Sequence, residues 1–371
     1  MIVLTVGPNK TPVTGQSKCY NHFIENTKHE VLNIYCNGYS KLYFFKYIYL
    51  IVYHRLFSKY EAIYFTSSRS KLGFIRDLVL VAVNYNRKNC LIVNHLHGAD
   101  FKEFYNTSNF FFKKIVDFVY FRIDISIVLT KGMKEQYLRY KHMKLEVVAN
   151  YYDDSDIGAI REFKVNEPLE ILFLSNLIPS KGYQELINTV NVINSMYDSR
   201  CLLHLAGAAF DANSRRLILN TDLGHHVKYH GVVSGEKKVE LLNRAHILAL
   251  PTYYPTEAQP LSLIEGMASG CYLITTDHNY LPEFVGSKNG SILNVQKDSF
   301  NKIDESQLLL HIKSAIEGDV ILNDVMNYNY LYARKHFSSL VYISKIDEIL
   351  EGKYEKSTHH RHHRPRRFLS S

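Results

Sequence analysis

The chain has few cysteines, and their spacing excludes several kinds of site. Only five of its 371 residues are cysteine, and the closest two, Cys19 and Cys36, lie 17 positions apart. Zinc sites and thiol redox motifs need cysteines separated by only about two to four residues. The spacing and the odd number of cysteines therefore favour a reduced protein of the cytosol.

No stretch of the sequence is apolar for long enough to cross a membrane. The most apolar segment, Leu42–Phe57, is interrupted by Lys46, His54 and Arg55, whereas a span needs about 20 apolar residues. Two interpretations stay open for it: a buried helix with a basic edge, which we favour, and an amphipathic helix at a membrane surface. The first residues, MIVLTVGPNK, do not have the pattern of a signal peptide.

The common phosphate-binding signatures are missing too. The glycine-bearing loop Gly7–Gln16 contains neither the GxGxxG fingerprint of dinucleotide-binding folds nor the lysine and hydroxyl pair that closes a P-loop. It follows the first predicted strand and opens a helix, where a glycine and a helix N-terminus favour an anionic ligand. A plain strand-to-helix turn is the alternative. No Asp-x-Asp metal motif lies in a convincing loop.

The formal net charge of +8 suits an anionic partner. A nucleic acid, an anionic membrane and an anionic small molecule are all compatible with it, but no nucleic-acid-binding module is present, so we expect no nucleic-acid partner. Part of the charge lies in the tail His359–Arg367, HHRHHRPRR. We expect residues 353–371 to form a disordered basic tail, with contact to a membrane or polyanion as the alternative.

Short apolar runs alternate with helical patterns along the whole chain. Runs this continuously apolar are typical of parallel strands that are covered by helices on both faces. The predicted strands are Ile2–Val6, Val31–Tyr35, Ala62–Phe65, Cys90–Asn94, Ser126–Leu129, Glu146–Ala149, Glu170–Leu174, Leu202–Ala206, Val227–His230, Ile247–Leu250, Tyr272–Thr275 and Ser291–Asn294. The predicted helices include Gln16–Asn26, Lys71–Val83, Phe110–Phe121, Lys131–Tyr140, Tyr183–Met196, Lys237–Arg244, Ser262–Ala268 and Glu305–Ile316.

This alternation predicts an α/β protein with two doubly wound domains. The polar stretch Asp153–Pro168 is the expected linker. We place an N-terminal domain at residues 1–160 and a C-terminal domain at 161–323. Helices at 324–352 are expected to cross back to the first domain. Ligands of such sheets bind outside the carboxyl ends of the strands, so a cleft between the domains is the expected site.

Two loops at predicted strand ends carry basic side chains. His95 and His97 in HLHGAD lie two residues apart on one face of a strand, and with Asp100 they could ligate a metal. We favour backbone contact to a ligand instead, with Asp100 capping the next helix. In SNLIPSKG, Lys181 opens a predicted helix, where its ammonium group and the helix N-terminus could together hold a phosphate.

The segment Pro251–Gly270, PTYYPTEAQPLSLIEGMASG, is the most informative. Glu257 precedes a helix that begins near Pro260, and Glu265 lies inside this helix among apolar residues. A carboxylate in such surroundings destabilises the fold unless it is paired. A carboxylate can accept hydrogen bonds from the two ribose hydroxyls, and the helix N-terminus can hold a diphosphate.

These blocks resemble those of the retaining GT-B glycosyltransferases of the large family-four group, the glycosyl transferases group 1. The resemblance rests on the two glutamates with seven residues between them, on SNLIPSKG, on HLHGADF and on the loop that ends at Gly15. It covers most of both domains. It implies the GT-B fold, two doubly wound Rossmann-like domains that face each other across a cleft.

The resemblance also implies a role for each matching residue. Glu265 would bind the donor's ribose, Glu257 the transferred sugar, and Lys181 the departing diphosphate. His97 would approach the sugar from the first domain. The remaining implied donor contacts are Gly15, Gln259, Pro260 and Leu261, with Gly207, Val232 and Val233 near the nucleobase.

One residue departs from the family pattern. Many relatives carry an arginine where this chain has Asn176, so stabilisation of the diphosphate would depend more on Lys181 and on helix dipoles. The implied enzyme needs no metal and no other cofactor, because the lysine replaces a divalent ion.

The sequence therefore predicts a glycosyltransferase that uses a UDP- or GDP-sugar. The expected acceptor is a glycan or a lipid-linked glycan of bacterial surface polysaccharide, such as O-antigen or capsule. Contact with the cytoplasmic face of an anionic membrane is expected because the segment from Lys41 to Tyr60 is rich in aromatic and basic residues. The alternatives are a nucleotide-sugar epimerase, a phosphorylase, which is usually a longer chain, and a non-catalytic carbohydrate-binding protein.

Overall fold

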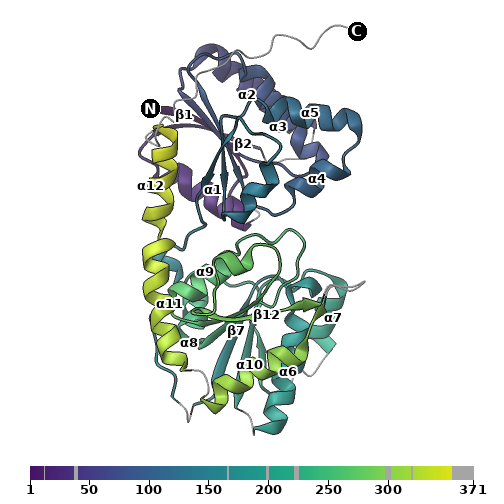
Figure 1. The fold of residues 1–371 in the computed structure, drawn as a ribbon, viewed down its shortest axis with the longest axis vertical. Helices are drawn as coiled ribbons and strands as arrows, with labels where there is room; N and C mark the ends of the chain where they lie inside the picture. The colour runs from purple at the N-terminus through teal and green to yellow at the C-terminus, as the bar shows by residue number, and fades with distance from the viewer. Residues whose placement is uncertain are drawn as a thin grey trace.

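The computed structural model describes residues 1–11, 13–36, 41–164, 167–197, 200–220, 225–296, 302–318 and 321–352. The basic tail at 353–371 lies outside these residues. The described chain forms two α/β domains stacked end to end, with the last helices running along one side of both (Figure 1). Each domain is built on a six-stranded sheet.

The first sheet is parallel throughout, with the strand order β2-β1-β3-β4-β5-β6. Its strands are β1 (Ile2–Gly7), β2 (Glu30–Tyr35), β3 (Ala62–Thr66), β4 (Leu91–Leu96), β5 (Ile125–Val128) and β6 (Lys144–Val147). The helices between them are α1 (Gly15–Asn26), α2 (Lys41–Phe57), α3 (Lys71–Asn84), α4 (Phe101–Thr107) and α5 (Phe110–Tyr120).

The second sheet is also parallel, with the order β12-β11-β10-β7-β8-β9. Its strands are β7 (Leu169–Leu174), β8 (Cys201–Ala206), β9 (Val227–Tyr229), β10 (Ile247–Ala249), β11 (Tyr272–Thr276) and β12 (Gly290–Leu293). The helices are α6 (Tyr183–Met196), α7 (Ala212–Asn220), α8 (Gly235–Arg244), α9 (Leu261–Ala268) and α10 (Glu305–Glu317), and a small hairpin pairs β13 (Val295–Gln296) with β14 (Lys302–Ile303).

Each predicted strand overlaps a strand of the structure, and the prediction of two parallel α/β sheets is confirmed. The prediction of an α-helix over Lys131–Tyr140 is wrong, because Gly132–Tyr137 forms a 3-10 helix. Neither α4, α7 nor the small hairpin was expected from the sequence. These elements are short, so their periodic patterns are weak.

The strand order places a switch point in each sheet, where the chain changes the direction in which it adds strands. In the second sheet the switch lies between β7 and β10, and in the first it lies between β1 and β3. Loops diverge from the carboxyl ends of the strands at such points and leave a crevice for a ligand. The loops after β7, β10, β1 and β3 are therefore the parts of the fold that are suited to a site.

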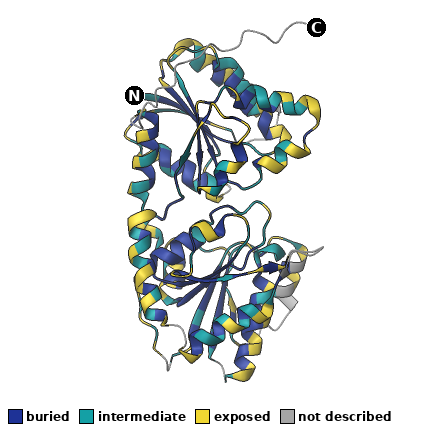
Figure 2. Ribbon diagram, in the orientation of Figure 1, coloured by how far each residue is buried: buried dark blue, intermediate teal, exposed yellow. Residues whose placement is uncertain are grey.

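Helix α2 departs from the interpretation that we favoured. Only one side of it packs, through Tyr47 and Ile51, while most of its other large side chains face solvent (Figure 2). Its exposed large hydrophobic residues are Leu42, Tyr43, Phe45, Tyr49, Val52, Tyr53, Leu56 and Phe57. The prediction of a buried helix is wrong, because α2 packs only on its inner side, against β2 and α3. None of the helices in the described ranges is long and apolar enough to span a bilayer.

The last two helices pack on different domains. Helix α11 (Leu322–His336) lies against α9 and β11 of the second domain, and α12 (Ser339–Leu350) lies on the first domain. On α12, Tyr342 and Ile346 join a core cluster with Tyr20 and Phe23 of α1. The C-terminal helix is therefore part of the hydrophobic core of the first domain.

This packing predicts the effect of trimming α12. Replacing Ile346, which is fully buried, with alanine should lower the free energy of unfolding by roughly 2–5 kcal/mol because it leaves a cavity. Urea denaturation followed by circular dichroism measures the change. Leu340 on the same helix is 78% exposed, so Leu340→Ala should change the stability by less than about 0.5 kcal/mol. Equal effects of the two substitutions would contradict the packing of α12.

Candidate functional site

The loops after β7 and β10 lie against each other at the switch point of the second sheet. The backbone N–H of Tyr253 donates to the carbonyl of Ser180 at 2.8 Å. Gly182 has φ +79°, and a side chain at this position would overlap the carbonyl of Pro251. Glycine is therefore required here both by the backbone conformation and by the close approach of the other loop.

Lys181 lies at the end of a short 3-10 helix, Pro179–Lys181, and not at the start of α6 as expected. The left-handed Gly182 interrupts the chain before α6 begins at Tyr183. This interruption directs Lys181 toward the neighbouring loop, where its ammonium group forms an ion pair with Glu257. The ammonium nitrogen also lies 4.8 Å from the ring centroid of Tyr254.

The Lys181–Glu257 pair is well shielded from water. The two side chains are only 12% and 11% exposed. Asn279 fixes the backbone of the Glu257 loop, because its side-chain amide donates to the carbonyl of Glu257 at 2.8 Å and to that of Pro255 at 3.0 Å. A shielded and rigid pair of opposite charges is suited to act on a polar ligand without large rearrangement.

Glu265 lies inside α9, the helix that follows the Glu257 loop and whose N-cap is Pro260. It is buried, with 4% of its surface exposed. Lys18 of α1 and Lys238 of α8 both contact its Oε1, at 2.8 Å and 3.0 Å. Asp156 of the linker contacts both lysines. The expectation that Glu265 needs a partner is confirmed, and the structure supplies two.

The residues at the start of α9 lie against the first domain. The side-chain oxygen of Gln259 accepts from the backbone N–H of Asn150 at 2.6 Å, and its carbonyl accepts from the Asn150 amide at 2.8 Å. A side chain at Gly15 would lie in ordinary contact with Leu261, at 3.8 Å. The resemblance implies a donor contact through the backbone at Gln259, and the structure adds that its side chain joins the two domains.

His97 lies at the carboxyl end of β4 in the first domain. Its ring lies beside that of His95, with 4.1 Å between centroids and 32° between the ring planes, as expected for two residues on one face. The hydroxyl of Tyr64 lies 2.7 Å from Nδ1 of His95. Burial, and then the nearby guanidinium of Arg69, lower the pKa of His97 to about 3, against a smaller opposing effect of Asn150. His97 is therefore neutral at physiological pH.

Asp100 does not cap α4 through its side chain, contrary to expectation. It forms an ion pair with Arg69 at 3.0 Å. Arg69 follows β3, at the switch point of the first sheet, and its guanidinium lies directly over Gly98, where any side chain would overlap it. The glycine in HLHGAD thus makes room for an arginine.

The remaining predicted residues of the second domain follow β7, β8 and β9 at the carboxyl end of its sheet. The exposed Asn176 accepts from the N–H of Ala208 at 3.2 Å. Gly207 has φ +151° and lies against the carbonyl of Ser175, so a side chain would overlap this oxygen. After β9, Val232 is exposed and Val233 packs partly on the core.

Several residues of this region were not predicted from the sequence. They are Lys18, Lys238, Asp156, Arg69 and Asn150. Lys18 lies in the first turn of the helix that Gly15 opens, which is the only local signal for it. The other four come from separate segments and gain their significance only from tertiary contacts.

Metal ligation has little basis in the described part of the chain, where no group of three histidine, cysteine or acidic side chains could hold an ion. The sequence Asp154-Ser155-Asp156 has the Asp-x-Asp form, but it forms a 3-10 turn in which Asp156 is bound to two lysines.

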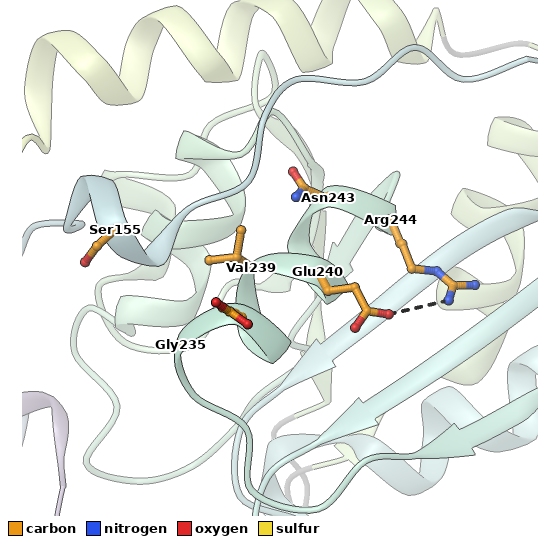
Figure 3. Close-up of a pocket in the computed structure, with 7 residues that line it drawn as sticks. Ser155, Gly235, Val239, Glu240, Asn243 and Arg244 are labelled. Atoms are coloured by element: carbon orange, nitrogen blue, oxygen red, sulfur yellow. Dashed lines mark ion pairs between the residues drawn. The ribbon is translucent and has the colours of Figure 1, made fainter.

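A surface pocket of about 620 Å³ lies at one side of α8. It is lined by Ser155 from the linker and by residues of α8 that include the ion pair Glu240–Arg244 (Figure 3). It contains neither Lys181, Glu257 nor Glu265. We therefore place the candidate site at the switch-point loops and not in this pocket.

Comparisons with known proteins identify a family match in the second domain. The family described as "Glycosyl transferases group 1" matches residues 159–313, which include Lys181, Glu257 and Glu265. No curated protein sequence matches the chain.

Solved structures of glycosyltransferases share the fold. HepE from Anabaena, crystallised with UDP and glucose, has a TM-score of 0.70 at 14% identity, with 95% of this chain and 100% of that chain covered. A glycosyltransferase from Rickettsia africae has a TM-score of 0.67 at 15% identity, with 96% and 99% covered. The lipopolysaccharide outer core galactosyltransferase WaaB has a TM-score of 0.66 at 15% identity, with 95% and 100% covered.

The buried position of His97 predicts a specific dependence of stability on pH. Its pKa of about 3 lies below the ordinary value of 6.5, so between these values the unfolded chain takes up a proton that the folded chain does not. Above pH 6.5 the residue has no effect, and below it the stability should fall by up to about 1.4 kcal/mol per pH unit because of this group.

Urea denaturation from pH 7.5 to pH 4.5 tests this dependence. The His97→Gln variant should lose less stability on acidification than the parent chain, whereas the exposed His142→Gln variant should follow the parent. NMR titration should show the imidazole of His97 neutral down to pH 4.5. Protonation near pH 6.5 would refute the assignment.

Proposed function

We propose that this chain is a retaining glycosyltransferase that uses a UDP- or GDP-sugar, since residues 159–313 match the glycosyl transferases group 1 family and the fold is shared with solved GT-B glycosyltransferases. The observation that carries the proposal is the shielded Lys181–Glu257 pair at the switch point, with Glu265 on the next helix. These are the three residues that the sequence assigned to the donor.

A nucleotide sugar fits the chemistry of this region. Its diphosphate requires positive charge, which Lys181 supplies, and its ribose requires hydrogen-bond acceptors, which Glu265 supplies. The N-terminus of α9 adds backbone N–H groups from Leu261 onward, since Pro260 has none. HepE was crystallised with UDP-glucose as well as with UDP and glucose, and this supports UDP-sugars as the first donors to test.

Bond cleavage separates a sugar with developing positive charge from a nucleoside diphosphate with increasing negative charge. We propose that Lys181 exchanges its contact with Glu257 for the diphosphate and stabilises it as it leaves. Glu257 then lies beside the sugar without its lysine partner. The neutral His97 offers the sugar a hydrogen bond from the first domain. No metal ion is required in this scheme, because the positive charge comes from the chain itself.

The acceptor hydroxyl attacks on the face from which the diphosphate departs and passes its proton to the departing phosphate oxygen, so the anomeric configuration is retained. Contacts between the domains support a closed site during this step. Gln136 donates to the hydroxyl of Tyr280 at 2.7 Å, and Glu283 accepts from the N–H of Gly132 at 2.8 Å. Closure excludes water and limits hydrolysis of the donor.

The exposed apolar side of α2 supports a lipid-linked acceptor. Eight large hydrophobic side chains of this helix face solvent, and exposed lysines at 46 and 59 lie among or beside them. Aromatic and basic side chains together suit an anionic bilayer surface. We propose that the enzyme works at the cytoplasmic face of the membrane, in synthesis of bacterial surface polysaccharide such as O-antigen or capsule. The similarity to WaaB supports this role.

Loss of Glu257 is the main test of the proposed site. Glu257→Ala and Glu257→Gln should each lower kcat/KM for sugar transfer by at least about 100-fold, since a group that acts in the transition state contributes several kcal/mol. The assay follows product formation by mass spectrometry with UDP- and GDP-sugars in the presence of EDTA. NMR of the product should show the anomeric configuration of the donor.

The exposed Glu236 in the first turn of α8 provides a matched control. Glu236→Ala should leave transfer unchanged. Full activity of both Glu257 variants would mean that the site is misassigned. Binding of a sugar without any transfer or hydrolysis would favour the carbohydrate-binding alternative.

The membrane contact has its own test. Phe45→Glu combined with Tyr49→Glu places two charges on the exposed side of α2, and should reduce binding to phosphatidylglycerol liposomes at least about tenfold, as expected from the apolar area involved. Liposome flotation measures binding. Leu340→Glu, at an equally exposed position on α12, should bind like the parent. An unmodified protein that stays wholly unbound would exclude the membrane contact.

A further inference from the structure

We infer that Lys18 and Lys238 are positioning residues for Glu265, which hold one of its carboxylate oxygens and leave the other for the donor ribose. This inference rests on the function proposed above and adds two residues to it. Neither lysine follows from the motif that contains the two glutamates, since Lys18 belongs to α1 of the first domain and Lys238 to α8 of the second.

The environment of Glu265 makes such partners necessary. The residue is on an apolar helix and almost fully buried. A lone carboxylate in this position would bind a proton, and a protonated acid is a weaker acceptor for a hydroxyl. The two ammonium groups and the two carboxylates of Glu265 and Asp156 form a cluster with no net charge. The cluster thus supplies Glu265 with the positive partners that its burial requires.

The two lysines also determine which oxygen is available. Both contact Oε1 of Glu265, at 2.8 Å and 3.0 Å. A carboxylate oxygen has about two lone-pair positions, so the two ammonium groups fill those of Oε1. Neither contact involves Oε2, which keeps its acceptor capacity for ribose hydroxyls. The sequence had suggested that both oxygens of the carboxylate accept from the ribose hydroxyls. In the arrangement inferred here, only Oε2 accepts from them.

Asp156 fixes the lysines from the other side. It contacts Lys238 at 3.1 Å and also contacts Lys18. Burial alone would raise the pKa of Asp156, but Lys18 and Lys238 outweigh it and lower this pKa. In turn, Glu265 and Asp156 raise the pKa of Lys18 despite its own burial. Because Lys18 comes from the first domain and Lys238 from the second, one of the two contacts that orient the ribose carboxylate depends on contact between the domains.

Nucleotide binding with and without ribose hydroxyls tests this role. Calorimetry compares UDP with 2′,3′-dideoxy-UDP, or the GDP pair if GDP binds more tightly. The parent chain should prefer the ribonucleotide by about 10- to 100-fold, the range for hydrogen bonds to a charged group. Lys238→Met and Lys18→Met should reduce this preference to less than about threefold, mainly by weakening the ribonucleotide.

Lys237 is the matched control, since it neighbours Lys238 on α8 but is exposed and pairs with Glu240. Lys237→Met should keep the full preference, and Lys238→Arg should restore part of it. If Lys238→Met is too unstable to purify, the Lys238→Met/Glu265→Gln double variant removes both charges. It should then show the same small preference as Glu265→Gln alone.

The outcomes separate this inference from the proposed function. A parent chain that binds neither UDP nor GDP would refute both. A parent chain that transfers sugar while Lys238→Met keeps the full ribose preference, or weakens both nucleotides equally, would overturn only the positioning role. Loss of preference in Lys238→Met and Lys18→Met but not in Lys237→Met would establish it.

Discussion

Two shielded carboxylates of this molecule need positive partners, and this need determines which segments and which domains must be in contact. Glu257 and Glu265 both lie where water has little access, and an unpaired charge in such a place costs several kcal/mol. Lys181 meets this need for Glu257 within one domain. For Glu265 the chain uses Lys238 from the same domain and Lys18 from the other. Because Lys18 belongs to the first domain, the contact between the domains is part of the candidate site.

The topology of the sheets explains why these groups can meet. Lys181 and Glu257 are 76 residues apart in sequence, but they follow β7 and β10, which are neighbours at the switch point. Gly182 then allows the two loops to touch at Pro251. In the first domain, Gly15 and Arg69 follow β1 and β3, the strands that flank its own switch point. Loops of the two domains meet at this end of the sheets, through the Lys18–Glu265 ion pair and the bond from the N–H of Ala99 to the carbonyl of Thr256.

The first domain combines two different surfaces. One side of its sheet is covered by α1 and by α12, which returns from the end of the chain to join the core. The other side carries α2, whose outer side chains are apolar and exposed. A buried contact is stabilised within the chain, whereas an exposed apolar surface is stabilised when a partner covers it. The difference supports a structural role for α12 and a binding role for α2.

The sequence by itself determined the strands, the two-domain α/β architecture and the glutamate pair. Continuous apolar runs between helical patterns are typical of covered parallel strands, and a glutamate among apolar residues such as Glu265 must find a partner. The partners themselves came from the tertiary structure, because Lys18, Lys238 and Asp156 lie on three separate segments and no local pattern relates them. The orientation of α2 was also decided at this level, since its composition allows both a buried helix, which we favoured, and an interfacial one. Likewise, no local pattern predicts the bond from the side chain of Gln259 to Asn150, because only the packing of the two domains brings that residue within reach.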